Sequence, residues 1–305
     1  MSKRRGQIQV QFNWIFVLIV GGLILLFFLG VVRTQKKLSD TKISATISTD
    51  LRAILSGVEV STQTAALIDI PKTEIDFNCE GYSVGGLAGM RPTASFSPNV
   101  IKGNRLMSWA VPWSVPYRIM NFVYLTSPEV RYIIVDDSSV IDDDSLADQL
   151  YAALPQKTVT EDGQENVLIN KNIITSVTTI TDLNNYKVKL IFFGAPTMPT
   201  SLQNSKHDIT AIKIVPTEDG IKGYGTVEYY SSSGTSFTLV DSTYYLGLPS
   251  LLATVFAEDI ESYNCNMQRA FKRMEFITDI YLERTKDLHG YYDLYSPASC
   301  LAPYS

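Results

Sequence analysis

An uncharged run near the N-terminus constrains this chain more than any other segment. Residues Gly6–Val32 include no charged side chain, and the centre of the run, Trp14–Val32, is a 19-residue apolar stretch. Three basic residues precede the run: Lys3, Arg4 and Arg5. A helix of that length crosses the hydrocarbon core of a bilayer, which is about 30 Å thick. The sequence therefore predicts a basic leader at 1–13 and a transmembrane helix at 14–32.

The rest of the chain is acidic. Three of its 26 Lys and Arg residues precede the apolar run, so 23 remain against 31 Asp and Glu, a net charge of −8. Nucleic-acid-binding proteins usually present a basic face to the phosphates, so we expect no nucleic-acid partner. A hydrophobic content of 45% with 19% charged residues is typical of a folded protein.

The orientation in the membrane follows from the leader. Four basic residues come soon after the apolar run: Arg33, Lys36, Lys37 and Lys42. The two flanks are therefore nearly balanced under the positive-inside rule. The reverse orientation would carry the basic amino terminus outward, so we expect a single-pass protein with a cytoplasmic N-terminus and an extracytoplasmic head.

The leader differs from a secretory signal peptide. Its apolar core is longer than about 15 residues, and no small-residue cleavage site follows it. Instead, the basic residues at 3–5 are followed by Gly6 and Gln7, just before the apolar run. This arrangement resembles the class III signal peptides of archaeal type IV pilins. The resemblance implies that a prepilin-type peptidase cuts between Gly6 and Gln7, and that the apolar helix remains as an anchor or a filament core.

Gln11 departs from the pilin pattern. In that family the fifth residue after the cut is commonly Glu, which can pair with the new amino terminus of a neighbouring subunit. The amide of Gln11 can hydrogen-bond that amine without the strength of a charged pair. The substitution favours a minor or pseudopilin-like subunit over a major one. An uncut signal anchor remains the alternative.

The helix is predicted to continue beyond the bilayer. Apolar residues recur at three- and four-residue spacing in a set that includes Ile43, Ile47 and Leu51, as one face of an amphipathic helix requires. No proline interrupts Trp14–Ile70. We therefore expect an amphipathic stalk helix over 33–70 and a head over 71–305.

The head is predicted to be α/β with a mixed sheet. Strand and helix patterns alternate along its centre: strands at Val130–Asp136, Tyr186–Phe193 and Ile209–Val215, and a helix at Asp144–Leu154. A hairpin is expected at Gly225–Tyr230 and Phe237–Val240, and a long helix from Ile260 to near His289. The segment Gly85–Arg105 is predicted to be a loop. The aromatic–proline cluster at Trp109–Tyr117 is predicted to be a rigid corner packed into the core.

The sequence contains few residue patterns that indicate catalysis or metal binding. Its two histidines, His207 and His289, have no metal-type spacing, so we expect no enzyme and no cofactor. Oxygen ligands for a hard cation could come from Asp136, at a strand end, and from Asp142 and Asp144. Acids at a helix start are more often caps, so these three are candidate ligands only.

Three cysteines fit an oxidising compartment, where one disulfide can form. Cys265 and Cys300 are separated by a predicted helix of about 35 Å, which the following tail could only just retrace when fully extended. Cys79 has no such limit, so we favour Cys79–Cys265.

The sequence supports two functions. The first is a pilin-like structural or assembly subunit of a type IV filament-type system, whose partners are the lipid bilayer and other pilin-like or membrane subunits. The second is an unprocessed single-pass protein whose head is a binding module. The N-terminal residue of the mature protein distinguishes the two.

Overall fold

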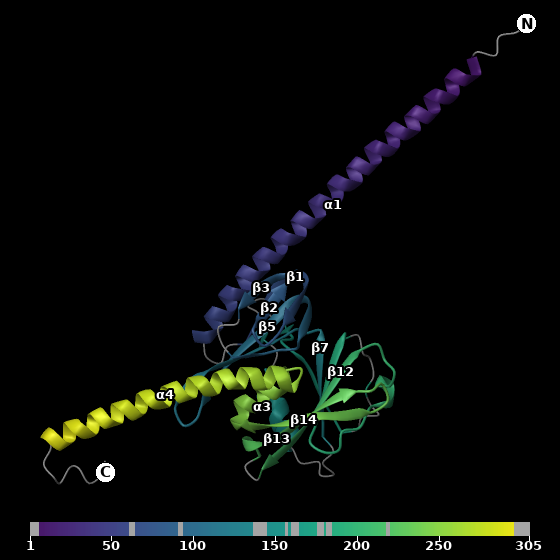
Figure 1. The fold of residues 1–305 in the computed structure, drawn as a ribbon. Helices are drawn as coiled ribbons and strands as arrows, with labels where there is room; N and C mark the ends of the chain where they lie inside the picture. Colours follow the sequence, from purple (N-terminus) through teal and green to yellow (C-terminus); the bar gives the residue numbers. More distant parts are fainter. Residues whose placement is uncertain are drawn as a thin grey trace, which may run out of the picture.

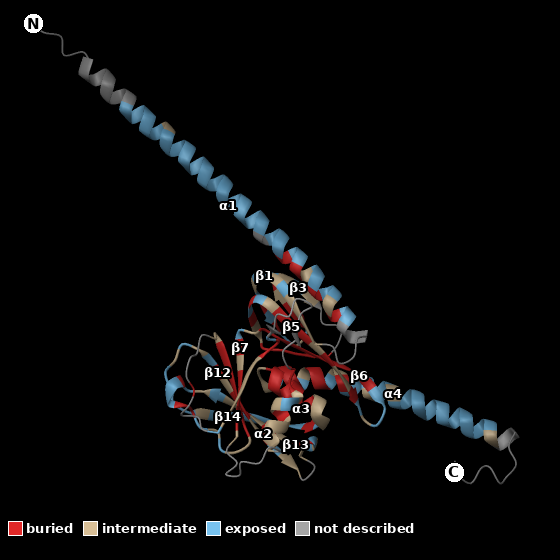
Figure 2. Ribbon diagram, turned by 180° about the vertical axis from the view of Figure 1, so that it is seen from behind, coloured by how far each residue is buried: buried red, intermediate tan, exposed pale blue. Residues whose placement is uncertain are grey.

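The computed structural model has an α/β head of two mixed β-sheets, with a long helix at each end of the chain (Figure 1). It describes residues 6–60, 65–90, 94–136, 145–155, 158–159, 165–175, 180, 185–217 and 220–295. The two long helices extend from the head in different directions in Figure 1 and in Figure 2. The predicted fold class is confirmed at this level.

Helix α1 (Gly6–Val60) runs for 55 residues and is about 80 Å long at 1.5 Å per residue. Over Trp14–Val32 every side chain is exposed except the half-buried Val20, because the head covers none of this stretch (Figure 2). Within the described residues, α1 is the one helix long and apolar enough to cross a membrane.

The helix ends earlier than predicted. Strand β1 (Ala65–Phe77) begins where the sequence predicts a helix to residue 70. Residues 65–69 pair antiparallel with strand β5 (Val100–Ser114), from Ala65 opposite Trp109 to Asp69 opposite Arg105. Residues 65–69 therefore make their backbone hydrogen bonds to β5 and not within a helix. The predicted end of the helix at residue 70 is wrong, because α1 ends at Val60.

The first sheet has the order β3-β2-β1-β5-β6-β4 and is antiparallel except for the β4–β6 pair. Its other strands are β2 (Gly81–Val84), β3 (Leu87–Met90), β4 (Ser95–Phe96) and β6 (Arg118–Thr126). Successive β6 side chains alternate between two cores: Phe122 and Tyr124 face one, and Val123 and Leu125 face the other. This sheet is therefore covered on both faces.

The loop predicted at Gly85–Arg105 is wrong over most of its length, because it contains β3, β4 and the start of β5. Its first two glycines form the two-residue turn between β2 and β3. Gly85 has a φ of +56° and Gly86 one of +84°, a conformation that favours glycine in tight hairpins. The glycine-rich composition is therefore that of a turn, and the residues beyond the turn pair in the sheet.

The predicted corner at Trp109–Tyr117 is only partly observed. Strand β5 continues through this segment to Ser114, and Pro112 lies within the strand, opposite Asn121. Trp113 is buried in the core as predicted, whereas Tyr117 is exposed in the turn to β6.

The second sheet has the order β10-β7-β11-β12-β13-β14. Its strands are β7 (Val130–Val135), β10 (Asn170–Ile174), β11 (Lys187–Phe192), β12 (Asp208–Thr217), β13 (Gly220–Ser232) and β14 (Phe237–Leu246). The first four strands in that order are parallel, and β12, β13 and β14 pair antiparallel. This arrangement confirms the predicted central strands and the hairpin. Smaller elements complete the region: α2 (Leu146–Ala153), β8 (Thr158–Val159), β9 (Glu165–Asn166) and the 3-10 helix η2 (Thr200–Leu202).

Two helices complete the core. Helix α3 (Gly247–Phe256) contacts strands of both sheets and is buried from Ser250 to Phe256. Helix α4 (Ile260–Tyr295) begins beside it and extends past the predicted end near His289. The Tyr124 hydroxyl of β6 donates to the Pro249 carbonyl of α3 at 2.6 Å, which ties α3 to the first sheet.

Candidate functional site

The candidate site with the best-defined geometry is the junction where α1 meets the head. Ile47, Leu51 and Leu55 are spaced four residues apart, lie on one face of the helix, and are buried. They form one core with side chains of the first sheet: Ile75, Phe77, Tyr82, Val84, Ile101, Leu106, Val123 and Leu125. Helix α1 is thus one continuous helix with two parts. Its apolar N-terminal part is exposed, and its C-terminal part is packed in a core with the first sheet.

The β2–β3 hairpin is shaped to receive α1. The Tyr82 hydroxyl donates to the Ser48 carbonyl of the helix at 2.9 Å. A Cβ at Gly89 would overlap the ring of Tyr82, and one at Gly85 would overlap the Ser44 hydroxyl. Glycine at these two positions therefore allows the hairpin to lie close against the helix.

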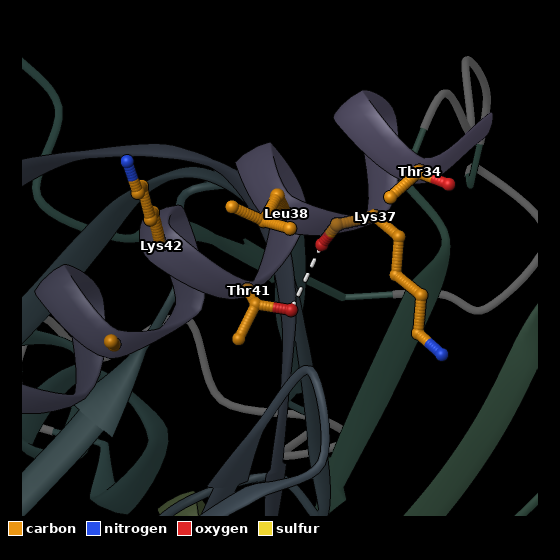
Figure 3. A pocket seen from close by; sticks show the side chains of 6 residues that line it. Thr34, Lys37, Leu38, Thr41 and Lys42 are labelled. Carbon is orange, nitrogen blue, oxygen red and sulfur yellow. Dashed lines mark hydrogen bonds between the residues drawn. The ribbon is translucent and has the colours of Figure 1, made fainter. Parts of the chain in front are cut away.

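A basic spacer separates the apolar run from this junction. The side chains of Arg33, Lys36, Lys37 and Lys42 are exposed. A hollow on this part of α1 is lined by Thr34, Lys37, Leu38, Thr41, Lys42 and Ala45, and Figure 3 shows Thr41 Oγ1 donating to the Lys37 carbonyl at 2.9 Å. All six lining residues come from one helix, so the hollow is a surface groove. Long basic side chains directly beyond an apolar span can reach back to the polar headgroup region of a bilayer.

A disulfide links the first sheet to α4. Cys79 follows β1 and Cys265 lies in the second turn of α4, and the two are bonded with a Cα–Cα distance of 5.9 Å. This confirms the favoured pairing. Cys300, the third candidate, lies outside the described residues.

A polar cluster lies between the two sheets. Lys187 Nζ is 2.9 Å from Asp208 Oδ2 and 2.5 Å from Glu258 Oε2. The same Glu258 oxygen accepts from the backbone N–H of Asn99 at 2.6 Å. Because these residues come from β11, β12, the α3–α4 connection and the β4–β5 connection of the first sheet, the cluster links the two sheets.

Lys189, two residues further along β11, is 3% exposed. Its amine donates to the Thr254 carbonyl at 2.8 Å and to the Ala257 carbonyl, at the C-terminal end of α3. Burial lowers the pKa of Lys189 to about 7. A lysine with this pKa can act as a base or nucleophile, but both bonds of this amine hold helix carbonyls. Its geometry is that of a buried helix cap.

Lys187 and Lys189 are not among the residues predicted from the sequence. The available signal was a pair of lysines two residues apart in an otherwise apolar strand, Lys187–Phe192. In a strand that is buried on both faces, such charges must meet partners. Those partners come from distant elements that the sequence does not place.

The candidate metal ligands are only partly described. Asp136 follows β7, and its N–H donates to the Ile174 carbonyl at 2.8 Å, which extends the β7–β10 pairing. Asp142 and Asp144 lie outside the described residues. Across the described ranges, no three His, Cys, Asp or Glu side chains are placed to hold a metal ion. His207 Nδ1 lies 2.7 Å from the Asn185 carbonyl oxygen, and His289 is on α4.

The predicted processing residues lie at the start of α1. Gly6 is its first residue, and Gln7 and Gln11 follow in its first turns. Comparison with protein-family models gives no match, and comparisons with curated proteins and with solved structures give none either.

Proposed function

We propose that this protein is a membrane-anchored, pilin-like structural or assembly subunit of a type IV filament-type system, of the minor pilin or pseudopilin kind. One observation carries the proposal. Helix α1 is continuous from an exposed apolar half, Trp14–Val32, to a half that is buried in the head at Ile47, Leu51 and Leu55. Such a helix can lie in lipid or pack against the helices of neighbouring subunits while it carries the head rigidly.

The leader defines how the subunit would mature. A prepilin-type peptidase cuts between Gly6 and Gln7 and leaves a new amino terminus directly before the apolar run. The amide of Gln11 then contacts the amine of a neighbouring subunit. The amphipathic continuation of α1 through the spacer lets the head stand clear of the membrane surface.

An extracytoplasmic head is the second part of the proposal. The disulfide Cys79–Cys265 supports it, because such bonds persist in oxidising compartments. The three basic residues before the apolar run then stay on the cytoplasmic side, so the short basic amino terminus does not have to cross the membrane.

The N-terminal residue of the purified full-length protein tests this proposal. Co-expression with a prepilin-type peptidase should give a chain that begins at Gln7, measured by mass spectrometry of the intact protein. A Gly6→Leu variant should keep Met1 or Ser2, because the residue before the cut is changed. A wild-type chain that keeps its first residues beside an active peptidase contradicts the pilin-like assignment.

The alternative is a permanent single-pass anchor whose head captures a partner. Gln11 is compatible with this alternative, because the acidic residue that is common at this position in pilins is absent. It predicts an intact N-terminus and a head that stays at the membrane when surface filaments are sheared off.

A further inference from the structure

A buried amine at the start of β11 contacts two carboxylates. Lys187 is buried, and its Nζ lies 2.9 Å from Asp208 Oδ2 and 2.5 Å from Glu258 Oε2. One carboxylate balances the charge of one ammonium group, so the second leaves the cluster with a net negative charge. Charges that are taken out of water in this way are costly to keep as separate ions.

The backbone holds Lys187 and Asp208 side by side. They are register partners in the parallel pairing of β11 with β12, and the Asp208 N–H donates to the Tyr186 carbonyl at 3.1 Å. The next residue of each strand, Val188 and Ile209, belongs to the core on one face of the sheet. Because side chains alternate along a strand, Lys187 and Asp208 both point to the opposite face.

Glu258 reaches the same amine from a third element, the connection between α3 and α4. Its side chain is 14% exposed, and the oxygen that contacts Lys187 also accepts from the backbone N–H of Asn99 at 2.6 Å. This carboxylate is therefore held in place beside the amine while it leaves the Asp208 carboxyl group free to react.

We propose that Lys187 and Asp208 condense to an isopeptide bond, an amide between the two side chains, and that Glu258 carries the protons. The bond formed joins Lys187 Nζ to Asp208 Cγ, and the bond broken is one of the two Cγ–O bonds. An ammonium group and a carboxylate contain the atoms of one amide and one water molecule, so the step needs no co-reactant. The product has lost two of the three charges of the cluster.

The steps follow from the contacts. Glu258 takes a proton from the ammonium group of Lys187 and passes it to the Asp208 carboxylate. The neutral Nζ then attacks Cγ, which is one covalent bond from the Oδ2 atom at 2.9 Å. The second proton of the amine passes through Glu258 to the departing hydroxyl group, which leaves as water. Positioned carboxylates transfer protons in this way at hydrogen-bond distance.

The fixed geometry favours the condensation. In solution water competes with an amine for a carboxyl group, whereas groups that are held together react with effective molarities of up to ~10⁵–10⁸ M. Asp208 is 54% exposed, so the released water can leave. Lys187 is buried, which restricts the access of water to the new bond on that side.

Tryptic mapping of the purified, disulfide-reduced full-length protein tests the bond. Trypsin does not cut after an acylated lysine, so residues 172–189 should be recovered joined to residues 207–213. The joined fragment should be lighter than the sum of its two parts by one water molecule. The Lys187→Arg variant should give the two fragments separately.

Two further variants separate a covalent bond from an ion pair. Asp208→Asn should give a joined fragment of the same mass as wild type, because the amine then displaces ammonia instead of water. The same substitution would simply remove an ion pair. Glu258→Gln keeps an acceptor for Asn99 but cannot carry protons, so it should slow the joining by about a hundredfold or more.

Lys213 and Glu228 provide a control within the same chain. They are register partners on β12 and β13 with Nζ and Oε2 3.3 Å apart, and Glu228 is the one described carboxylate in ion-pair contact with Lys213. Trypsin should therefore cut after Lys213 in every variant. Circular dichroism and the thermal unfolding temperature should show that Glu258→Gln is folded.

The proposal is overturned if folded wild-type protein yields the fragments 172–187 and 207–213 separately. It is also overturned if Asp208→Asn leaves them separate while wild type joins them, or if Glu258→Gln joins them at the wild-type rate. None of these substitutions lies near the N-terminus, so the N-terminal residue remains an independent test of the pilin-like assignment.

Discussion

The Tyr82 hydroxyl of the β2–β3 hairpin donates a hydrogen bond to the Ser48 carbonyl of α1 at 2.9 Å. This bond lies beside the buried stripe Ile47, Leu51 and Leu55, so polar and apolar contacts hold the same stretch of helix. A force on the membrane end of α1 is therefore transmitted to the first sheet.

Leu51→Ala should lower the free energy of unfolding of the head by about 3 kcal/mol, through lost burial and a cavity in the α1 core. The measurement is urea unfolding of the full-length protein in micelles, followed by tryptophan fluorescence. Leu38→Ala is the control, because Leu38 is exposed on the same helix. Equal effects of the two substitutions would contradict a head that is packed on α1.

Tyr82→Phe should lower the free energy of unfolding by about 1 kcal/mol, because it removes a hydrogen bond and keeps the ring in the core. It should also make the C-terminal part of α1 more sensitive to proteolysis, since the helix loses its polar contact with the hairpin. Tyr224→Phe, at an exposed tyrosine of β13, should change neither property. If Tyr82→Phe matched this control, the hydroxyl would contribute nothing to the junction.

Cys265→Ser and Cys79→Ser should destabilise the protein to the same extent, by up to about 5 kcal/mol for so long a closed loop. The double variant should be no worse than either single one, because both remove one bond that closes a separation of 186 residues. Cys300→Ser should leave the unfolding midpoint unchanged. A large effect of Cys300→Ser on unfolding would show that this cysteine supports the folded head.

The stability of the head should depend on pH through Lys189. Burial lowers its pKa from an ordinary value of 10.5 to about 7, so between these values the unfolded chain binds a proton that the folded chain lacks. The folded state is most stable with respect to Lys189 above pH 10.5, where this amine is neutral in both states. Its free energy of unfolding falls as the pH falls toward 7, because protonation favours the unfolded chain. Wild type should therefore gain stability relative to Lys189→Met as the pH rises from 7 to 9.5.

Thermal unfolding of both proteins across that range measures this difference. Several tyrosines also have a raised pKa, but they are shared by the two proteins and cancel in the comparison. If the unfolding temperatures of the two proteins changed with pH by the same amount, Lys189 would be protonated in the folded state.

Local patterns predict much of this molecule. The span Trp14–Val32 follows from composition, and the strands of the second sheet follow from their apolar runs. The Cys79–Cys265 pairing follows from reach along the chain, because a helix between Cys265 and Cys300 holds those two residues apart.

Long-range pairing accounts for what the sequence did not predict. Ala65–Ile70 is a strand because β5 lies beside it, and the glycines of the predicted loop form a turn between paired strands. Lys187 and Lys189 depend on carboxylates and carbonyls that are distant in the sequence.

Alkaline carbonate extraction of membranes from cells that make the full-length chain tests the central claim most directly. The account predicts that the protein remains in the membrane pellet, because Trp14–Val32 lies in lipid. Recovery of the intact chain as a water-soluble monomer, with that stretch covered by its own head, would contradict the anchor and the proposed function with it.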